Sequence, residues 1–166
     1  MENRYAHLLS PFQVGNVVFR NRMFTAPMGL HALQGGELYP TEAIITHYAN
    51  KAKGGAAVVT CSGTGAYPVT PDQDHLSYDL YIGHSQHYLA QLADAIHFYG
   101  AKASMEIQAA TKERGYYVSG GLMVPGPGMV PGQPTKELTR EMLEEIKKNL
   151  QDQVKILKRI GYDMCM

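Results

Sequence analysis

Short apolar runs alternate along the chain with longer amphipathic segments, and this alternation predicts strands and helices in turn. Three runs, at Met23 to Ala26, Val58 to Cys61 and Ser104 to Ile107, are too short for helices and suit strands of a buried parallel sheet. Pro27 and Gly29 should stop the first of them, because proline removes a backbone donor and glycine frees the backbone. The sequence therefore predicts a loop at the carboxyl end of this strand, where α/β proteins hold ligands.

Three amphipathic helices are expected between and after these strands, at about Thr41 to Lys53, Ser85 to Tyr99 and Thr139 to Gly161. The first and third begin at a threonine that can act as an N-cap, and glycines end both of them. Apolar residues at helical spacing mark the faces that we expect to be buried. They are Ala43, Ile44, Tyr48 and Ala52; Leu89, Leu92, Ile96 and Tyr99; and Leu143, Ile146, Leu150, Val154 and Leu157.

Other segments frame this core. Pro11 to Val14 and Val17 to Arg20 are β-prone and flank Gly15-Asn16, a pair that suits a tight hairpin. Leu30 to Tyr39 is expected to be a loop. The stretch from Ala109 to Leu138 is rich in glycine and proline, and loops of that length in a compact fold are usually lids or binding segments.

The elements thus follow the order of a hairpin, three strand–helix units and the start of a fourth strand at Tyr162 to Met166. This order implies a parallel sheet with right-handed crossovers, either an open doubly wound sheet or part of a barrel. Glycines follow the first two strands and a carboxylate lies in the third, which favours a barrel whose loops share one site. We expect the strands to pair side by side, with the helices on one outer face.

The composition of the 166-residue chain narrows the range of ligands. Fifteen basic residues balance fifteen acidic ones, so a nucleic-acid or anionic-membrane partner is not indicated, and a small-molecule ligand is expected. The start of the chain has no apolar signal region and no later run is long enough to span a membrane, which predicts a cytoplasmic protein. Cys61 and Cys165 form no CxxC motif and the histidines are dispersed, so neither a disulfide nor a metal site is predicted.

A series of short motifs carries a resemblance to a known family. They are Asn21-Arg22 leading into Ala26-Pro27-Met28, then Leu38-Tyr39-Pro40, His47-Tyr48, Gly100-Ala101-Lys102 and Ile160-Gly161-Tyr162-Asp163. In order and spacing, from about Leu8 to the last residue, the chain resembles the old yellow enzyme family of NADH:flavin oxidoreductases. It is most similar to the branch of 2,4-dienoyl-CoA reductase and the bile-acid and enoate reductases. The resemblance implies an α/β fold, the N-terminal half of a (β/α)8 TIM barrel with a short β-hairpin before it.

The resemblance also implies a cofactor and a reaction. The family holds FMN noncovalently at the carboxyl mouth of the barrel; NAD(P)H reduces the flavin, which passes hydride to an activated alkene such as an enone or enoyl substrate. By resemblance, Ala26, Pro27, Met28 and Gly29 form the wall after the first strand, where main-chain groups meet the isoalloxazine ring. Gly63 takes the small-residue position of the second strand, where a planar ring must approach the backbone closely.

Three further residues receive roles by the same comparison. Glu106 matches a position where many relatives carry a flavin-binding glutamine; the alternative is a structural carboxylate paired with Arg22 or Lys102. His31, in the loop after the first strand, matches a substrate-pocket position, with a solvated surface histidine as the alternative. His47 matches a family motif but is interpreted as a structural histidine.

The chain departs from the family in two places. Where many relatives continue with His-x-Gly-Arg, this chain has Ala109-Ala110-Thr111-Lys112. It also stops within the fourth strand, before the family's pair of a His with an Asn or second His, which binds the flavin and the substrate carbonyl, and before the later phosphate-binding loops. Residues 1–166 are therefore expected to form a partial FMN-binding domain with no catalytic residue of its own. In the closer branch, domains with a 4Fe-4S cluster and FAD would follow in a full-length parent.

Two functional hypotheses follow. The first is the N-terminal fragment of an FMN-dependent ene-reductase that uses NAD(P)H. The alternative is a noncatalytic half-barrel remnant, or half of an assembly, that binds no flavin alone. In both cases the isolated chain is expected to be inactive and to self-associate.

Overall fold

The structure, a computed structural model, describes residues 4–65, 78–108, 118–119, 122–123 and 139–166; for His31 and for residues 118–119 and 122–123 it describes the backbone. The elements in chain order are α1 (Ala6–Leu9), β1 (Phe12–Val14), β2 (Val17–Phe19), β3 (Phe24–Thr25), α2 (His31–Gln34), α3 (Glu42–Lys53), β4 (Val58–Gly65), α4 (Gly83–Phe98), β5 (Lys102–Gln108), β6 (Val118–Ser119), β7 (Leu122–Met123), α5 (Arg140–Arg159) and β8 (Met164–Cys165).

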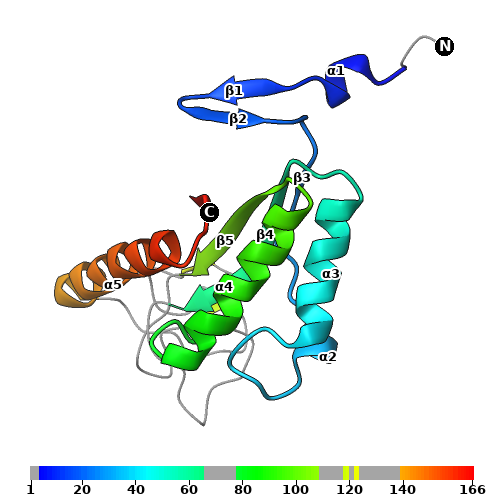
Figure 1. The fold of residues 1–166 in the computed structure, drawn as a ribbon. Helices are drawn as coiled ribbons and strands as arrows, with labels where there is room; N and C mark the ends of the chain where they lie inside the picture. The colour runs from blue at the N-terminus through cyan, green and yellow to red at the C-terminus, as the bar shows by residue number, and fades with distance from the viewer. Residues whose placement is uncertain (1–3, 66–77, 109–117, 120–121, 124–138) are drawn as a thin grey trace.

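Four parallel strands form the central sheet, in the order β3-β4-β5-β8 (Figure 1). Phe24 of β3 lies opposite Val58 of β4, and Ser104 of β5 lies opposite Met164 of β8. Parallel neighbours need a crossover connection, and α3, α4 and α5 provide one between each successive pair of strands. The predicted side-by-side pairing of the first three strands is confirmed, and the fourth strand extends the sheet as expected.

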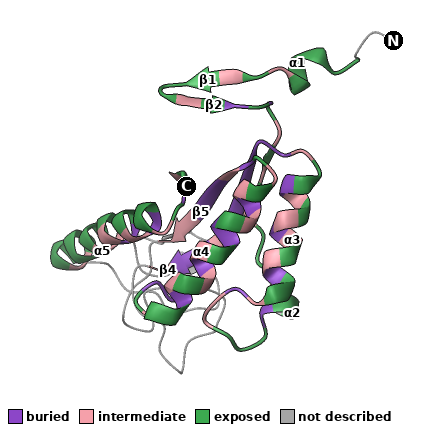
Figure 2. Ribbon diagram, in the orientation of Figure 1, coloured by how far each residue is buried: buried purple, intermediate pink, exposed green. Residues whose placement is uncertain are grey.

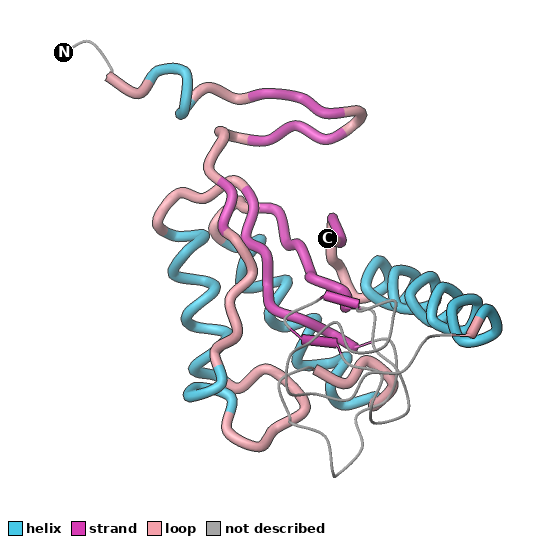
Figure 3. The backbone as a smooth tube through the Cα atoms, turned by 180° about the vertical axis from the view of Figure 1, so that it is seen from behind, coloured by secondary structure: helices cyan, strands magenta, loops and turns pink. Residues whose placement is uncertain are grey.

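The helices α3, α4 and α5 share one hydrophobic core with one face of the sheet. Figures 1 and 3 show α3 and α4 side by side along the strands. Alternate strand residues point to the same face of a sheet. On β4 and β5 these are Val59, Cys61, Ala103 and Met105, and all four are buried in this core. Figure 2 shows the exposed residues of α3 and α4 on their outer sides and buried residues along β4 and β5. The expected arrangement, with helices on one outer face, is confirmed.

The caps of these helices are those predicted from the sequence. The side chain of Thr41 accepts a hydrogen bond from the backbone N–H of Ile44, and that of Thr139 accepts one from Met142. Each bond satisfies one of the donors left open in a first helical turn. These threonines therefore set the starts of α3 and α5.

The N-terminal hairpin packs at the amino ends of the strands (Figure 1). Strands β1 and β2 are antiparallel and are joined through Gly15, whose φ of 56° explains the glycine in this turn. The ring of Phe19 is buried and lies 5.0 Å from that of Phe12 and 5.2 Å from that of Phe24. This aromatic cluster joins the hairpin to β3 and leaves the carboxyl ends of the strands uncovered by it.

The structure corrects several expected boundaries. Strand β4 continues to Gly65 instead of ending near Cys61, with a register shift against β5 between Cys61 and Thr64. The short helix α2 lies within the segment 30–39, which was expected to be a loop. In the segment 109–138, expected to be one long loop, β6 and β7 form an antiparallel pair, and the other residues of that segment lie outside the described part.

The buried face of α5 also differs from the prediction. Leu143 and Val154 are exposed, whereas Ile146, Gln153 and Leu157 are buried. The buried positions follow each other by seven and four residues, which is one helical stripe. The apolar pattern predicted the burial of Ile146 and Leu157 correctly and missed Gln153, because that member of the stripe is polar. On α3, Ala43 is likewise exposed, and on α4 Tyr99 is only half-buried.

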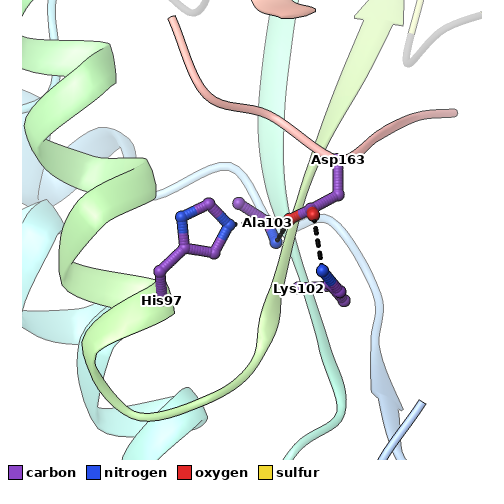
Figure 4. A network of polar contacts seen from close by, with 4 residues as sticks. All are labelled: His97, Lys102, Ala103 and Asp163. Atoms are coloured by element: carbon purple, nitrogen blue, oxygen red, sulfur yellow. Dashed lines mark hydrogen bonds and ion pairs between the residues drawn. The ribbon is translucent and has the colours of Figure 1, made fainter. Parts of the chain in front are cut away.

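A polar network ties the amino ends of β5 and β8 to the end of α4 (Figure 4). The carboxylate of Asp163 accepts hydrogen bonds from Lys102 Nζ at 2.8 Å and from the backbone N–H of Ala103 at 2.9 Å, and it lies 2.7 Å from His97 Nε2. Burial alone would raise the pKa of Asp163, but these hydrogen bonds outweigh it and hold the pKa below its ordinary value. The folded protein therefore favours the ionised form of the Asp163 side chain over the protonated form.

Removal of this charge is expected to destabilise the fold. Asp163→Asn should lower the free energy of unfolding at neutral pH by about 1–3 kcal/mol, because it removes the negative charge and replaces one of the two oxygens that face Lys102, His97 and the backbone N–H of Ala103 with a donor. A depressed pKa in the folded state gives stability that is present above the ordinary aspartate pKa of about 4 and is lost as the pH falls through the folded value. Urea unfolding from neutral to acidic pH should therefore show a smaller acid loss of stability in Asp163→Asn than in the wild type.

The matched control is Asp152→Asn, which removes a carboxylate from an exposed pair with Lys155 on α5. Exposed pairs contribute little to stability, so this variant should unfold near the wild-type urea concentration. Equal effects of the two substitutions would contradict the assigned importance of the Asp163 network.

Candidate functional site

The candidate site lies at the carboxyl ends of β3, β4 and β5, opposite the hairpin. Residues 26–29, the expected wall, follow β3 directly; Ala26, Met28 and Gly29 are exposed and Pro27 is half-buried. Gly63 is buried within β4, and Glu106 is half-buried near the end of β5. Since these strands are adjacent and parallel, the three predicted segments meet at one edge of the sheet.

Tyr48 joins two of these segments. Its hydroxyl donates a hydrogen bond to the carbonyl oxygen of Met28 at 2.9 Å and accepts one from the backbone N–H of Ser62, also at 2.9 Å. The side chain is fully buried in α3, and this desolvation raises the pKa of Tyr48, so the hydroxyl stays protonated and can donate. The sequence indicated Tyr48 as a core residue and as part of the His47-Tyr48 motif; the structure shows that its hydroxyl links the wall after β3 to the end of β4.

Gly63 faces the side chain of Gln108, which sequence reasoning did not single out. A Cβ atom placed on Gly63 would lie 2.8 Å from Nε2 of Gln108, closer than nonbonded atoms approach. The carbonyl of Gly63 accepts a hydrogen bond from the backbone N–H of Tyr78 at 3.0 Å. Glycine at this position therefore makes room for the amide of Gln108, which lies where a larger residue would place its Cβ.

Glu106 forms neither of the ion pairs considered for it. Lys102 is bound to Asp163, and Arg22 donates to the carbonyl of His7 and lies over the ring of Phe12. The carboxylate of Glu106 instead accepts a hydrogen bond from Nε2 of Gln108 at 3.4 Å. The alternative of a structural carboxylate paired with Arg22 or Lys102 is wrong, and the flavin contact of Glu106 stays a prediction.

Gln153 of α5 holds the end of β4 from the helical side. Its side chain accepts a hydrogen bond from Oγ1 of Thr64 at 2.8 Å and donates to the carbonyl of Gly65. Gln153 is fully buried, so these polar partners are what make a glutamine acceptable there. Its spacing from Ile146 and Leu157 is the sequence signal that could have identified it.

Three histidines considered for roles in the sequence differ in position. His31 begins α2 after the wall segment, and its side chain lies outside the described part, so its substrate role stays a prediction. His47 is half-buried; desolvation, and then the charge of Lys51, lower its pKa. His97 lies at the opposite end of the strands, beside Asp163.

The described residues contain neither a metal-binding cluster nor a helix that could cross a membrane. No group of three or more His, Cys, Asp or Glu side chains in the described ranges is placed to hold a metal ion. In the same ranges, none of the helices combines the length and the apolar character that crossing a membrane requires. The departure at residues 109–112 lies outside the described part.

Comparisons with known proteins identify the family. The chain is 32% identical over 165 residues to a metal reductase from Desulforamulus reducens, an alignment that covers 94% of this chain and 23% of that protein. It is 30% identical over 151 residues to an NADH oxidase from Thermoanaerobacter brockii, covering 86% of this chain and 22% of the relative. The chain thus spans about a quarter of the length of these relatives.

The chain superimposes on the solved structure of a 2-naphthoyl-CoA reductase in complex with 2-naphthoyl-CoA with a TM-score of 0.78. The two sequences are 22% identical, and the superposition covers 97% of this chain and 27% of the reductase. The predicted fold, a partial TIM barrel with an N-terminal hairpin, is confirmed. The model of the NADH:flavin oxidoreductase / NADH oxidase family matches residues 7–164. The chain therefore belongs to this family, the old yellow enzymes.

Proposed function

We propose that residues 1–166 form the first half of an FMN-dependent oxidoreductase that transfers hydride from NAD(P)H through the flavin to an activated C=C bond. The observation that carries this proposal is that the exposed wall at 26–29, the glycine at position 63 and the carboxylate of Glu106 meet at the carboxyl end of a parallel sheet. The membership of a flavin oxidoreductase family supports it.

The residues present fit a flat, partly polar ring. Gly63 has no side chain and is covered by the flexible side chain of Gln108, which a ring can displace, and the wall at Met28 and Gly29 is open to solvent. Glu106 supplies an acceptor for a ring N–H. In this proposal the wall and Gly63 hold the two sides of FMN, and Glu106 orients its pyrimidine edge. Tyr48 fixes the spacing of the two sides through Met28 and Ser62.

FMN supplies the hydride relay when it is bound. The described half contributes the binding and orientation of the ring, and we assign no proton donor to it. The groups that hold the flavin phosphate and protonate the product belong, in this proposal, to the other half of a complete barrel. The substrate class we propose is an enone or enoyl compound; FAD and a 4Fe-4S cluster are proposed only for further domains of a full-length parent.

Saturation-transfer difference NMR tests this proposal on residues 1–166. The method observes the ligand, detects complexes with millimolar dissociation constants and works with self-associated protein. Isoalloxazine protons of millimolar FMN should receive saturation from the protein, with a dissociation constant of about 0.1 mM or weaker, because half of the ring's contacts are missing. No transfer to FMN would favour the alternative, a half-barrel that binds no flavin.

A further inference from the structure

Gln108, the last residue of β5, carries a polar group that the proposed function does not use. Glu106 and Gln108 are alternate residues of one strand, so their side chains project from the same face of the sheet. Nε2 of Gln108 lies 3.4 Å from Oε2 of Glu106 and against the backbone of Gly63. The amide therefore touches two of the three segments that make up the candidate site.

The two side chains have complementary chemistry. A carboxylate accepts hydrogen bonds but cannot donate them, whereas a primary amide has two N–H donors. An acceptor beside a donor is the counterpart of an imide edge, in which a ring N–H stands next to a carbonyl. The pyrimidine ring of an isoalloxazine carries such an edge.

We infer that Glu106 and Gln108 act as a pair that binds the imide edge of the flavin, Glu106 accepting from the ring N–H and Gln108 donating to the adjacent carbonyl. This inference rests on the proposed function and adds the donor that Glu106 alone cannot supply. The amide has two N–H groups, so Gln108 can bind the ring carbonyl with one and keep its bond to Glu106 with the other.

The contact between Gln108 and Gly63 places the amide next to the position that we propose for the flavin ring. A planar ring that settles on Gly63 takes the space in which the Gln108 amide now lies. The side chain of glutamine has three rotatable bonds, and its hydrogen bond to Glu106 is long. The amide can therefore move from the backbone of Gly63 to the edge of the incoming ring.

The test compares FMN with FMN methylated at its imide nitrogen, using saturation-transfer titrations of residues 1–166. Wild-type protein should bind FMN about tenfold more tightly than the methylated analogue, the worth of one hydrogen bond to a charged acceptor. Glu106→Ala should lose this preference. Gln108→Ala should bind FMN about tenfold more weakly and keep the preference, because the ring N–H still meets Glu106.

Further variants exclude a merely structural effect. Gln108→Glu has the same size but no donor, so it should weaken FMN at least as much as Gln108→Ala. Gln91→Ala removes an exposed glutamine of α4, bonded to His87, and should leave both affinities unchanged. Thermal melts of all variants verify that each is folded.

The outcomes separate this inference from the proposed function. Unchanged FMN affinity in Gln108→Ala, or loss in that variant of the preference for FMN over the methylated analogue, overturns the inferred role of the Glu106–Gln108 pair. The proposal that the chain binds FMN is not affected by either result. Failure of wild-type protein to bind FMN overturns the proposed function for this chain and the inference with it.

Discussion

Replacement of Gly63 by leucine is expected to abolish the binding of FMN to residues 1–166. Gly63 is buried at the meeting point of β4 and β5, and the atom nearest to a new Cβ is Nε2 of Gln108, at 2.8 Å. That neighbour is the end of a flexible side chain, so the fold can accommodate the substitution by moving it. The leucine would then fill the surface on which the ring must lie, and no saturation transfer to FMN should be seen.

The chain offers a matched control in Gly83→Leu. Gly83 is exposed at the start of α4, and a Cβ there meets no atom within 4 Å. This variant adds the same side chain and should bind FMN like the wild type. His97→Ala, which disturbs the network at the opposite end of the strands, should also leave FMN bound. If Gly63→Leu binds FMN as tightly as Gly83→Leu does, Gly63 is not part of the flavin site.

The sequence predicted the fold well where one local signal was enough. The apolar run before Cys61 defined a buried strand, and the cap residues Thr41 and Thr139 fixed two helix starts, because each of these depends on neighbours in the chain. The buried face of α5 was wrong at Leu143 and Val154, since apolar character alone does not decide burial. Gln153 replaces an apolar residue there to satisfy Thr64 and Gly65, which lie far away in sequence.

The candidate site was less predictable for a related reason. Gly63 and Glu106 could be singled out by their types and positions, whereas the importance of Tyr48 and Gln108 depends on contacts between different strands and helices. Tyr48 looks like any core residue until its hydroxyl is seen between Met28 and Ser62. Interactions of this kind become visible only once the sheet order and register are known.

The two outer strands of the sheet, β3 and β8, affect how residues 1–166 behave in isolation. Among the described residues, strand β3 pairs only with β4 and β8 pairs only with β5, so each of these two strands has one side without a partner strand. Unpaired strand edges are templates for pairing with another chain. Large apolar side chains are exposed beside them, including Phe24 at 49% and Met166 at 61%. Both features favour association between copies of residues 1–166.

Purified residues 1–166 are expected to be colourless, to form dimers or larger species, and to show no NAD(P)H-dependent reduction of alkenes. Flavin affinity in a barrel comes from loops around the whole mouth, and strands β3, β4, β5 and β8 supply only part of it, so weakly held FMN should be lost during purification. Size-exclusion chromatography with a visible spectrum, followed by an NADH oxidation assay, measures all three properties. A monodisperse yellow monomer that oxidises NADH would show that one half of the barrel suffices for the flavin and for its reduction.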